Sequence, residues 1–99
     1  MAIVNSEHID IDPAICHGRP RIRGTRIRVQ DIVVEHLYHG LCAEEIVGEF
    51  PHLTLGDVYA ALAYYYDHLD EIRQTMRNDH EFVERMRAEA PSLLRRKAF

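Results

Sequence analysis

Residues 19–29 read RPRIRGTRIRV, and this stretch decides how the N-terminal part of the chain folds. Residues 21–23 and 26–29 both alternate arginine with an apolar residue, which is the two-residue period of a β-strand. Gly24 and Thr25 lie between them, and a glycine at the first central position is typical of a type II′ hairpin turn. The stretch therefore predicts a short β-ribbon whose two strands are joined by a tight turn.

The register of this ribbon gathers its arginines on one face. A turn at Gly24 pairs Ile22 with Ile27, so that the isoleucines face the core. Arg21 then lies opposite Arg28, and like charges facing each other across a ladder weaken the pairing. The arginine face therefore requires a counter-charge: DNA phosphate, acidic side chains of the same assembly, or an acidic protein partner. The candidate nucleic-acid-binding residues are Arg19, Arg21, Arg23, Arg26 and Arg28.

Charge is sorted into blocks along this chain of 99 residues, although the net charge is only −4. Residues 1–12 carry three acids, and residues 13–30 carry the five arginines and no acid. Residues 31–72 carry nine acids and no lysine or arginine, whereas residues 73–99 carry seven bases and four acids. Such blocks indicate faces with different partners, or solvated surfaces. The nine acids are the internal alternative to phosphate as the counter-charge of the ribbon.

Size and composition indicate one small cytoplasmic domain that oligomerisation would help to stabilise. No apolar run is long enough to span a bilayer, so we expect no membrane association. Cys16 and Cys42 fit neither a disulfide framework nor a zinc spacing. Because no catalytic carboxylate pair, activated nucleophile or phosphate-binding glycine loop is recognisable, we expect a protein that is not an enzyme and has no cofactor or metal.

Beyond the ribbon, the apolar period changes to that of helices at residues 29–37, 43–50 and 55–66. Thr54 is a good N-cap for the third helix, with Asp57 completing a capping box. Three helices joined by short turns resemble a helix-turn-helix domain. The inward positions are Val29, Ile32, Val33, His36 and Leu37; Ala43, Ile46, Val47 and Phe50; and Leu55, Val58, Leu62 and Tyr65.

A fourth helix is predicted from residue 69 to residue 90, where Pro91 stops it. Its apolar residues recur at alternating steps of three and four, interrupted only by Asp79. Such a stripe is too long for so small a core to cover, so it should meet a partner protein or a second subunit. Its candidate partner-binding residues are Leu69, Ile72, Met76, Phe82, Val83, Met86, Arg85, Arg87, Arg95 and Arg96.

The fold class that these patterns predict is mainly α, with a small N-terminal β-ribbon, a helix-turn-helix-like three-helix bundle and a long C-terminal helix. Residues 1–68 form the predicted dimerisation and DNA-binding domain, and residues 69–99 the partner-binding helix and tail. Residues 55–66 contain no Arg, Lys, Asn or Gln, the side chains that best read base edges. If DNA is bound, the ribbon should therefore bind it, and the tyrosines of the third helix should pack a core and a dimer interface.

Five segments together resemble one bacterial family: CHGRP (16–20), IRGTRIRV (22–29), GLCAEEI (40–46), FPHLT (50–54) and DVYAALAY (57–64). This family is catalogued as domain of unknown function number 433 and is often described as VapB-like antitoxins. The resemblance implies a homodimer without catalysis, a PIN-like ribonuclease toxin held by the C-terminal tail, and binding to the antitoxin's own operator DNA.

Two departures from the family pattern affect these expectations. Cys42 stands where the family usually has a Ser or Thr helix cap, so the second helix is expected to fray at its start. Arg21 and Arg28 are more basic than the family's usual residues, which strengthens the charge of the ribbon.

The preferred interpretation is a type II antitoxin that masks its toxin stoichiometrically and autorepresses its operon. The alternative is a non-catalytic oligomeric adaptor or scaffold with neither toxin nor operator.

Overall fold

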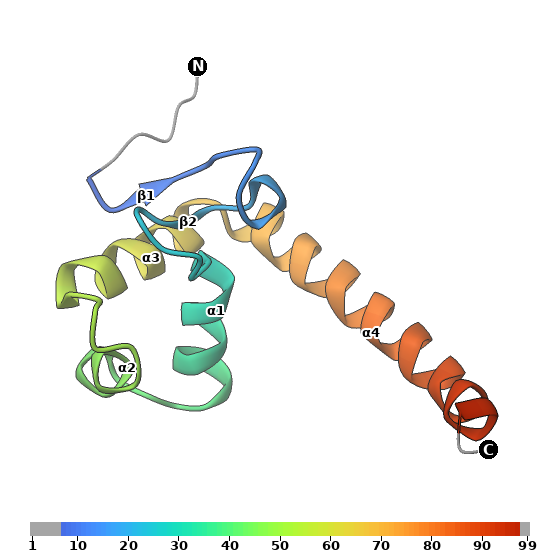
Figure 1. The fold of residues 1–99 in the computed structure, drawn as a ribbon. Coiled ribbons are helices and arrows are strands. Elements are labelled where there is room, and N and C mark those ends of the chain that lie inside the picture. The colour runs from blue at the N-terminus through green and yellow to red at the C-terminus, as the bar shows by residue number, and fades with distance from the viewer. Residues whose placement is uncertain (1–6, 98–99) are drawn as a thin grey trace. The chain divides into compact units, whose positions relative to one another are not determined.

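The structure is a computed structural model that describes residues 7–97, and of residues 91–97 it describes the backbone only. Within this range the chain is mainly helical, with four α-helices and one small two-stranded antiparallel sheet near the N-terminus (Figure 1). The predicted fold class is confirmed. By its internal contacts the chain divides into two units, residues 1–69 and residues 70–99.

The sheet consists of β1 (Ile9–Asp10) and β2 (Arg21–Ile22), with Ile9 opposite Ile22. The predicted ribbon register is confirmed, because Arg21 forms an antiparallel bridge with Arg28, but residues 26–29 contribute only this isolated bridge and not the second strand that was predicted. Two backbone hydrogen bonds flank this bridge: Ile22 donates to Ile27 at 2.8 Å, and Val29 donates to Pro20 at 2.9 Å. β2 is therefore central, with β1 on one side and the residues around Arg28 on the other.

The turn of the ribbon differs from the predicted type II′ turn. It spans Ile22–Thr25, whose ends are joined by a 3.0 Å hydrogen bond from the Thr25 amide to the Ile22 carbonyl. Gly24, with φ +80°, therefore occupies the third position, as in a type II turn. The Thr25 hydroxyl explains the shift, because it donates to the Ile22 carbonyl at 2.8 Å and accepts from the Ile27 amide at 3.0 Å.

The loop between the two strands contains a short 3₁₀ turn, η1 (Cys16–Gly18). All three of its residues have positive φ, of 55°, 56° and 76°. The left-handed region is unfavourable for non-glycine residues by about 1 kcal/mol or more each, so Cys16 and His17 hold a strained conformation. The Cys16 thiol donates to the Arg26 carbonyl at 3.4 Å and so ties this turn to the ribbon.

The first predicted helix is interrupted by a change of helical pitch. α1 (Val29–Val33) continues into η2 (Val34–Tyr38), a π-helical segment in which the His39 amide donates to the Val34 carbonyl at 3.1 Å. A π turn holds extra backbone, so it rotates the following residues away from the α-helical phase. The inward position predicted for Leu37 is therefore wrong, since this side chain is 45 % exposed.

α2 (Ala43–Glu49) begins with a cap, although Cys42 led us to expect fraying. The Glu45 carboxylate accepts a 2.9 Å hydrogen bond from the Cys42 amide and thereby satisfies one of the donors at the start of the helix. Hydrogen bonds from the backbone and side chain of Cys42 lower the pKa of Glu45, against a smaller opposing effect of burial. A carboxylate at the third helical position thus caps the start of α2 although position 42 is neither Ser nor Thr.

α3 (Leu55–Asp67) begins as predicted at Thr54. The Asp57 amide donates to the Thr54 hydroxyl at 3.1 Å, and the Thr54 amide donates to the Asp57 carboxylate at 2.9 Å. The capping box is therefore confirmed. Leu55 was expected to face inward, but as the first residue of the helix it lies 42 % exposed, outside the face that packs.

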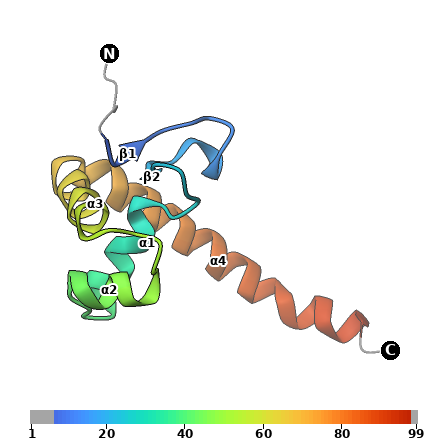
Figure 2. The ribbon, with the colours of Figure 1, turned by 60° about the vertical axis from the view of Figure 1, so that its left-hand side comes forward.

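The core of residues 7–69 lies where the sheet, α1 and α2 pack against α3. The sheet and α2 lie on opposite sides of this unit (Figure 2). No charged or polar residue is fully buried among the residues described here, so apolar burial is the main stabilising contribution. The buried residues of this unit are Ile9, Ile22, Val29, Ile32, Val33, Ala43, Ile46, Leu53, Val58, Ala61, Leu62 and Tyr65.

α4 spans Leu69–Lys97 and makes up almost all of the second unit. The predicted stop at Pro91 is wrong, because the helix continues through this residue. Proline removes one backbone hydrogen bond and hinders the preceding residue, but it does not forbid helix when good helix formers surround it. Here alanine, leucine, arginine and lysine dominate the positions on either side.

Candidate functional site

Arg21 is held by an acidic side chain of the neighbouring strand. Its Nε lies 2.7 Å from Oδ1 of Asp10, and its Nη2 lies 3.3 Å from Oδ2, which is a two-pronged ion pair. Nη1 donates to the Thr25 carbonyl at 2.9 Å. The side chains of Arg21 and Asp10 are only 11 % and 19 % exposed. The Arg21 side chain therefore stabilises the ribbon itself, because it joins β2 to Asp10 of β1 and to the Thr25 carbonyl of the turn.

Arg28 is also paired, with the acidic block that follows the ribbon. Its Nη2 and Nε donate to the two carboxylate oxygens of Asp31 at 2.8 and 3.2 Å. The same carboxylate accepts from the Arg28 amide at 2.9 Å and so caps α1. The charge of Arg28 is thus neutralised locally, at the point where the ribbon becomes helix.

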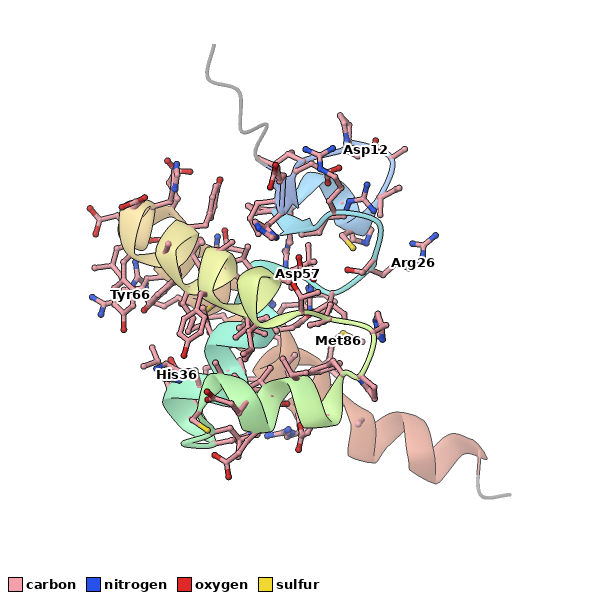
Figure 3. The ribbon with its side chains drawn as sticks, turned by 90° about the vertical axis from the view of Figure 1, so that its left-hand side faces the viewer. Asp12, Arg26, His36, Asp57, Tyr66 and Met86 are labelled. Atoms are coloured by element: carbon pink, nitrogen blue, oxygen red, sulfur yellow. The ribbon has the colours of Figure 1, made fainter. Side chains whose placement is uncertain are left out.

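The other three arginines of the ribbon are less tightly held. Arg23 lies 3.3 Å from the second oxygen of Asp10, and Arg19 donates to the Gln30 amide oxygen at 3.3 Å. Arg26 is exposed, and its guanidinium has no partner in the described part of the chain. Its side chain extends away from the body (Figure 3). The ribbon therefore offers Arg26 as its most available cation.

His8 joins the start of β1 to the start of α3. Its Nδ1 donates to Oδ1 of Asp57 at 2.8 Å, across 49 positions of sequence. Its ring also closely approaches Gly56, where an added Cβ would lie only 3.1 Å from the His8 Cε1. Partial burial raises the pKa of Asp57, but hydrogen bonds from Thr54 and His8 outweigh this effect and bring the pKa below its ordinary value.

Replacement of Asp57 by asparagine should therefore lower the free energy of unfolding by about 1 kcal/mol, the usual magnitude for the loss of a helix cap. Because the folded-state pKa of Asp57 is lowered, its contribution is complete above the unfolded-state pKa of about 4 and is lost as pH falls through the lower folded-state value. Chemical denaturation at pH 7 and pH 3 checks this, since the wild type and D57N should differ less at the lower pH. An equal difference at both pH values would contradict it.

The tyrosines of α3 divide between the core and the surface. Tyr65 is buried, and Tyr64 stacks on His68 with ring centres 3.9 Å apart. Tyr59 and Tyr66 remain 56 % and 57 % exposed, on the outer face of the helix. The prediction of core packing is therefore confirmed for Tyr65. His36, predicted to face inward, is half-buried and donates to the Leu41 carbonyl at 2.9 Å.

The candidate partner-binding residues of α4 differ in exposure. Leu69 and Met76 are half-buried and Ile72 is buried, whereas the apolar residues farther along are about half exposed. We call Phe82, Val83 and Met86 the apolar row of α4. Arg87 pairs with Glu84 at 3.2 Å, and Arg85 is exposed. Arg95 and Arg96 lie in the helix, but their side chains are outside the described residues.

Metal-binding clusters and membrane-spanning helices are two further features that bear on function. Among the residues described, no group of three or more His, Cys, Asp or Glu side chains is arranged to hold a metal ion. Within the same part of the chain, no helix is both long and apolar enough to cross a membrane.

Residues 9–65 match the family model described as "Protein of unknown function (DUF433)". These residues make up more than half of the chain. The chain belongs to the DUF433 family. The crystal structure of a DUF433 member from Anabaena variabilis ATCC 29413 is similar, with 34 % sequence identity and a TM-score of 0.65. The similarity covers 71 % of this chain and 68 % of that chain. No curated protein matches the chain in sequence.

Membership in DUF433 confirms the family that the sequence motifs indicated. The family description and the crystal structure's name assign no activity, so the antitoxin role stays a prediction. The match to the family model covers the ribbon and the helices up to Tyr65, and it ends before the apolar row of α4. The sequence did not predict the contacts of His8, because neither its spacing nor its neighbours mark it as the partner of a cap 49 residues away.

Proposed function

We propose that this DUF433 protein is the antitoxin of a type II toxin–antitoxin pair and neutralises a PIN-like ribonuclease by stoichiometric binding through α4. The observation that supports this most is the apolar row. Phe82, Val83 and Met86 are each about half exposed, on a helix that forms a unit of its own. An amphipathic helix that leaves such a row uncovered suits a partner that offers a hydrophobic groove.

The charges of α4 suit a nuclease as the partner that provides this groove. A PIN-type nuclease concentrates carboxylates around its metal site, and arginine is the side chain that best pairs with carboxylates in two-pronged geometry. Arg85 is exposed and has no partner in the described part of the chain, so it can pair without breaking an existing bond. The mechanism is masking: the row anchors the helix, and arginines beside it occupy the acidic site.

Co-purification with the PIN-like product of the adjacent gene tests this proposal. Replacing Val83 and Met86 together by glutamate should weaken binding at least about 100-fold, since interface anchors account for about 2 kcal/mol or more each. The matched control replaces the exposed Gln74 and Ala88 by glutamate, which adds the same charge to α4 outside the row. Equal binding by both variants, or no binding by the wild type, would overturn the proposal.

Autorepression of the operon is the second part of the proposal, and Arg26 is the residue that carries it. Replacing Arg26 by glutamine should reduce the slope of log K against log salt for operator binding by about 1 for each phosphate that the side chain no longer neutralises. Arg26→Lys retains the charge and should leave the slope unchanged. If the slope is the same in the wild type and in both variants, the ribbon does not contact DNA phosphate through Arg26.

One observation favours the alternative, a non-catalytic oligomeric adaptor that binds no operator. Arg21 and Arg28 are already paired with Asp10 and Asp31, so two of the five arginines need no external anion. In that case the ribbon is a structural element, and the apolar row of α4 serves a partner other than a nuclease. Binding of a PIN-like protein in the co-purification experiment discriminates between the two functions.

A further inference from the structure

α3 leaves one of its faces uncovered, and this face carries a continuous apolar stripe. Its members follow one another at steps of four, four and three residues, which keeps them on one side of a helix. None of them is charged, and all are exposed. The α3 stripe consists of Leu55, Tyr59, Ala63 and Tyr66. Asp57 and Tyr66 lie toward opposite ends of α3 (Figure 3). From Leu55 to Tyr66 there are eleven helical steps, so the stripe is about 17 Å long.

The order of large and small side chains in the stripe fits a second copy of the same helix. When two α3 helices run antiparallel about a two-fold axis near their middle, Tyr59 faces the partner's Ala63. In the same register Leu55 falls beside the partner's Tyr66. A large residue thus meets a small one at the centre, as close packing requires. In a parallel pair Tyr59 would instead face the partner's Tyr59, and Ala63 would face the partner's Ala63 across a gap.

The charges at the ends of the stripe are compatible with the same arrangement. Asp67 is the last residue of α3, so in an antiparallel pair it lies beside the N-terminal turn of the partner helix. The helix dipole favours a carboxylate at this end of a helix. The two Asp67 side chains lie at opposite ends, farther apart than the screening length of about 8 Å at physiological salt. Self-association therefore keeps the two Asp67 carboxylates apart, and the partner's Asp57 carboxylate in that N-terminal turn is already engaged by Thr54 and His8.

From this size and charge complementarity we infer that the α3 stripe is a self-association surface, in which α3 packs antiparallel against α3 of a second copy of this chain. The surface is separate from the row of α4 to which the proposed function assigns the toxin. A standard protein interface uses about 20–30 residues a side, many more than the stripe supplies. The dimer is therefore in concentration-dependent equilibrium with the monomer.

Sedimentation of the full-length chain over a range of concentrations tests the inference. The wild type should shift from monomer to dimer. Ala63→Lys and Tyr59→Glu should each raise the dissociation constant at least about 30-fold, because each change occurs twice in a symmetric interface and places a charge in its centre. The matched control, Ala88→Lys, makes the same change on the exposed side of α4 and should leave the dissociation constant within about two-fold.

Mixing the two α3 variants tests the register itself. In a mixed pair, Lys at position 63 of one chain faces Glu at position 59 of the other, while the second contact keeps its native Tyr and Ala. The mixture should therefore form heterodimers, although each variant alone is monomeric and circular dichroism shows that each is folded. A wild type that stays monomeric at every concentration, or α3 variants that dimerise as the wild type does, would overturn the inference. Dimers that dissociate only when Val83 is changed to Glu would assign self-association to α4 instead.

Discussion

Replacing Asp10 by alanine should lower the free energy of unfolding by about 3 kcal/mol, the magnitude seen when one partner of a largely buried ion pair is removed. The Asp10 carboxylate pairs with both Arg21 and Arg23, and the Arg21 side chain is 11 % exposed. Removal of the Asp10 carboxylate leaves the Arg21 guanidinium desolvated without its counter-charge, on a strand of only two residues. Denaturation by urea at neutral pH measures the effect.

The neighbouring acid Glu7 provides the matched control, because it is exposed and Glu7→Ala should cost less than about 0.5 kcal/mol. A second comparison replaces both partners, Asp10 by leucine and Arg21 by methionine. This double variant should regain most of the stability that D10A loses, since apolar side chains of similar size need no counter-charge. If D10A is as stable as the control, the pair contributes little and Arg21 is available to external anions.

Ile32→Ala should be the most destabilising single change in α1, at about 3 kcal/mol, because this side chain is completely buried where α1 packs on α3. The destabilisation combines the transfer of apolar surface with the cavity that remains. Leu37→Ala, which lies five residues farther along, should cost less than about 1 kcal/mol, since its side chain is about half exposed. Chemical denaturation of both variants gives the comparison.

This second pair of variants also tests the π-helical segment. In an uninterrupted α-helix from Val29, the eighth following position would return to the inner face, and Leu37 would be as important as Ile32. The π turn in η2 removes Leu37 from that face. Equal destabilisation by I32A and L37A would therefore contradict the observed change of pitch.

Local patterns in the sequence predicted those parts of the fold that local interactions determine. The alternation around Gly24 predicted the pairing of Arg21 with Arg28, and Thr54 with Asp57 predicted the start of α3. Errors arose where a side chain competed with the expected pattern. The Thr25 hydroxyl moved the turn by one residue, and the π turn of η2 changed the phase of a helix without any proline or glycine to signal it.

The environment of the arginines could be predicted only in part. Their shared need for an anion followed from the register, and the acidic block after the ribbon supplied Asp31. The main partner, Asp10, comes instead from the short acidic segment before the ribbon. Its role depends on β1 pairing with β2, a contact between strands eleven residues apart that no turn signal specifies. The sequence therefore predicted the charge of this surface, but not how much of that charge is already neutralised.

The division of the chain into two units determines what each spectroscopic probe can report. All five tyrosines lie in residues 1–69 and the chain has no tryptophan, so tyrosine fluorescence follows only the first unit. Far-ultraviolet circular dichroism is dominated by helix and includes the 29 residues of α4, whose helix–coil transition needs no tertiary core. The fluorescence and the circular dichroism should therefore give unfolding transitions that do not coincide. A two-state fit to the dichroism alone would give a wrong free energy of unfolding for the first unit.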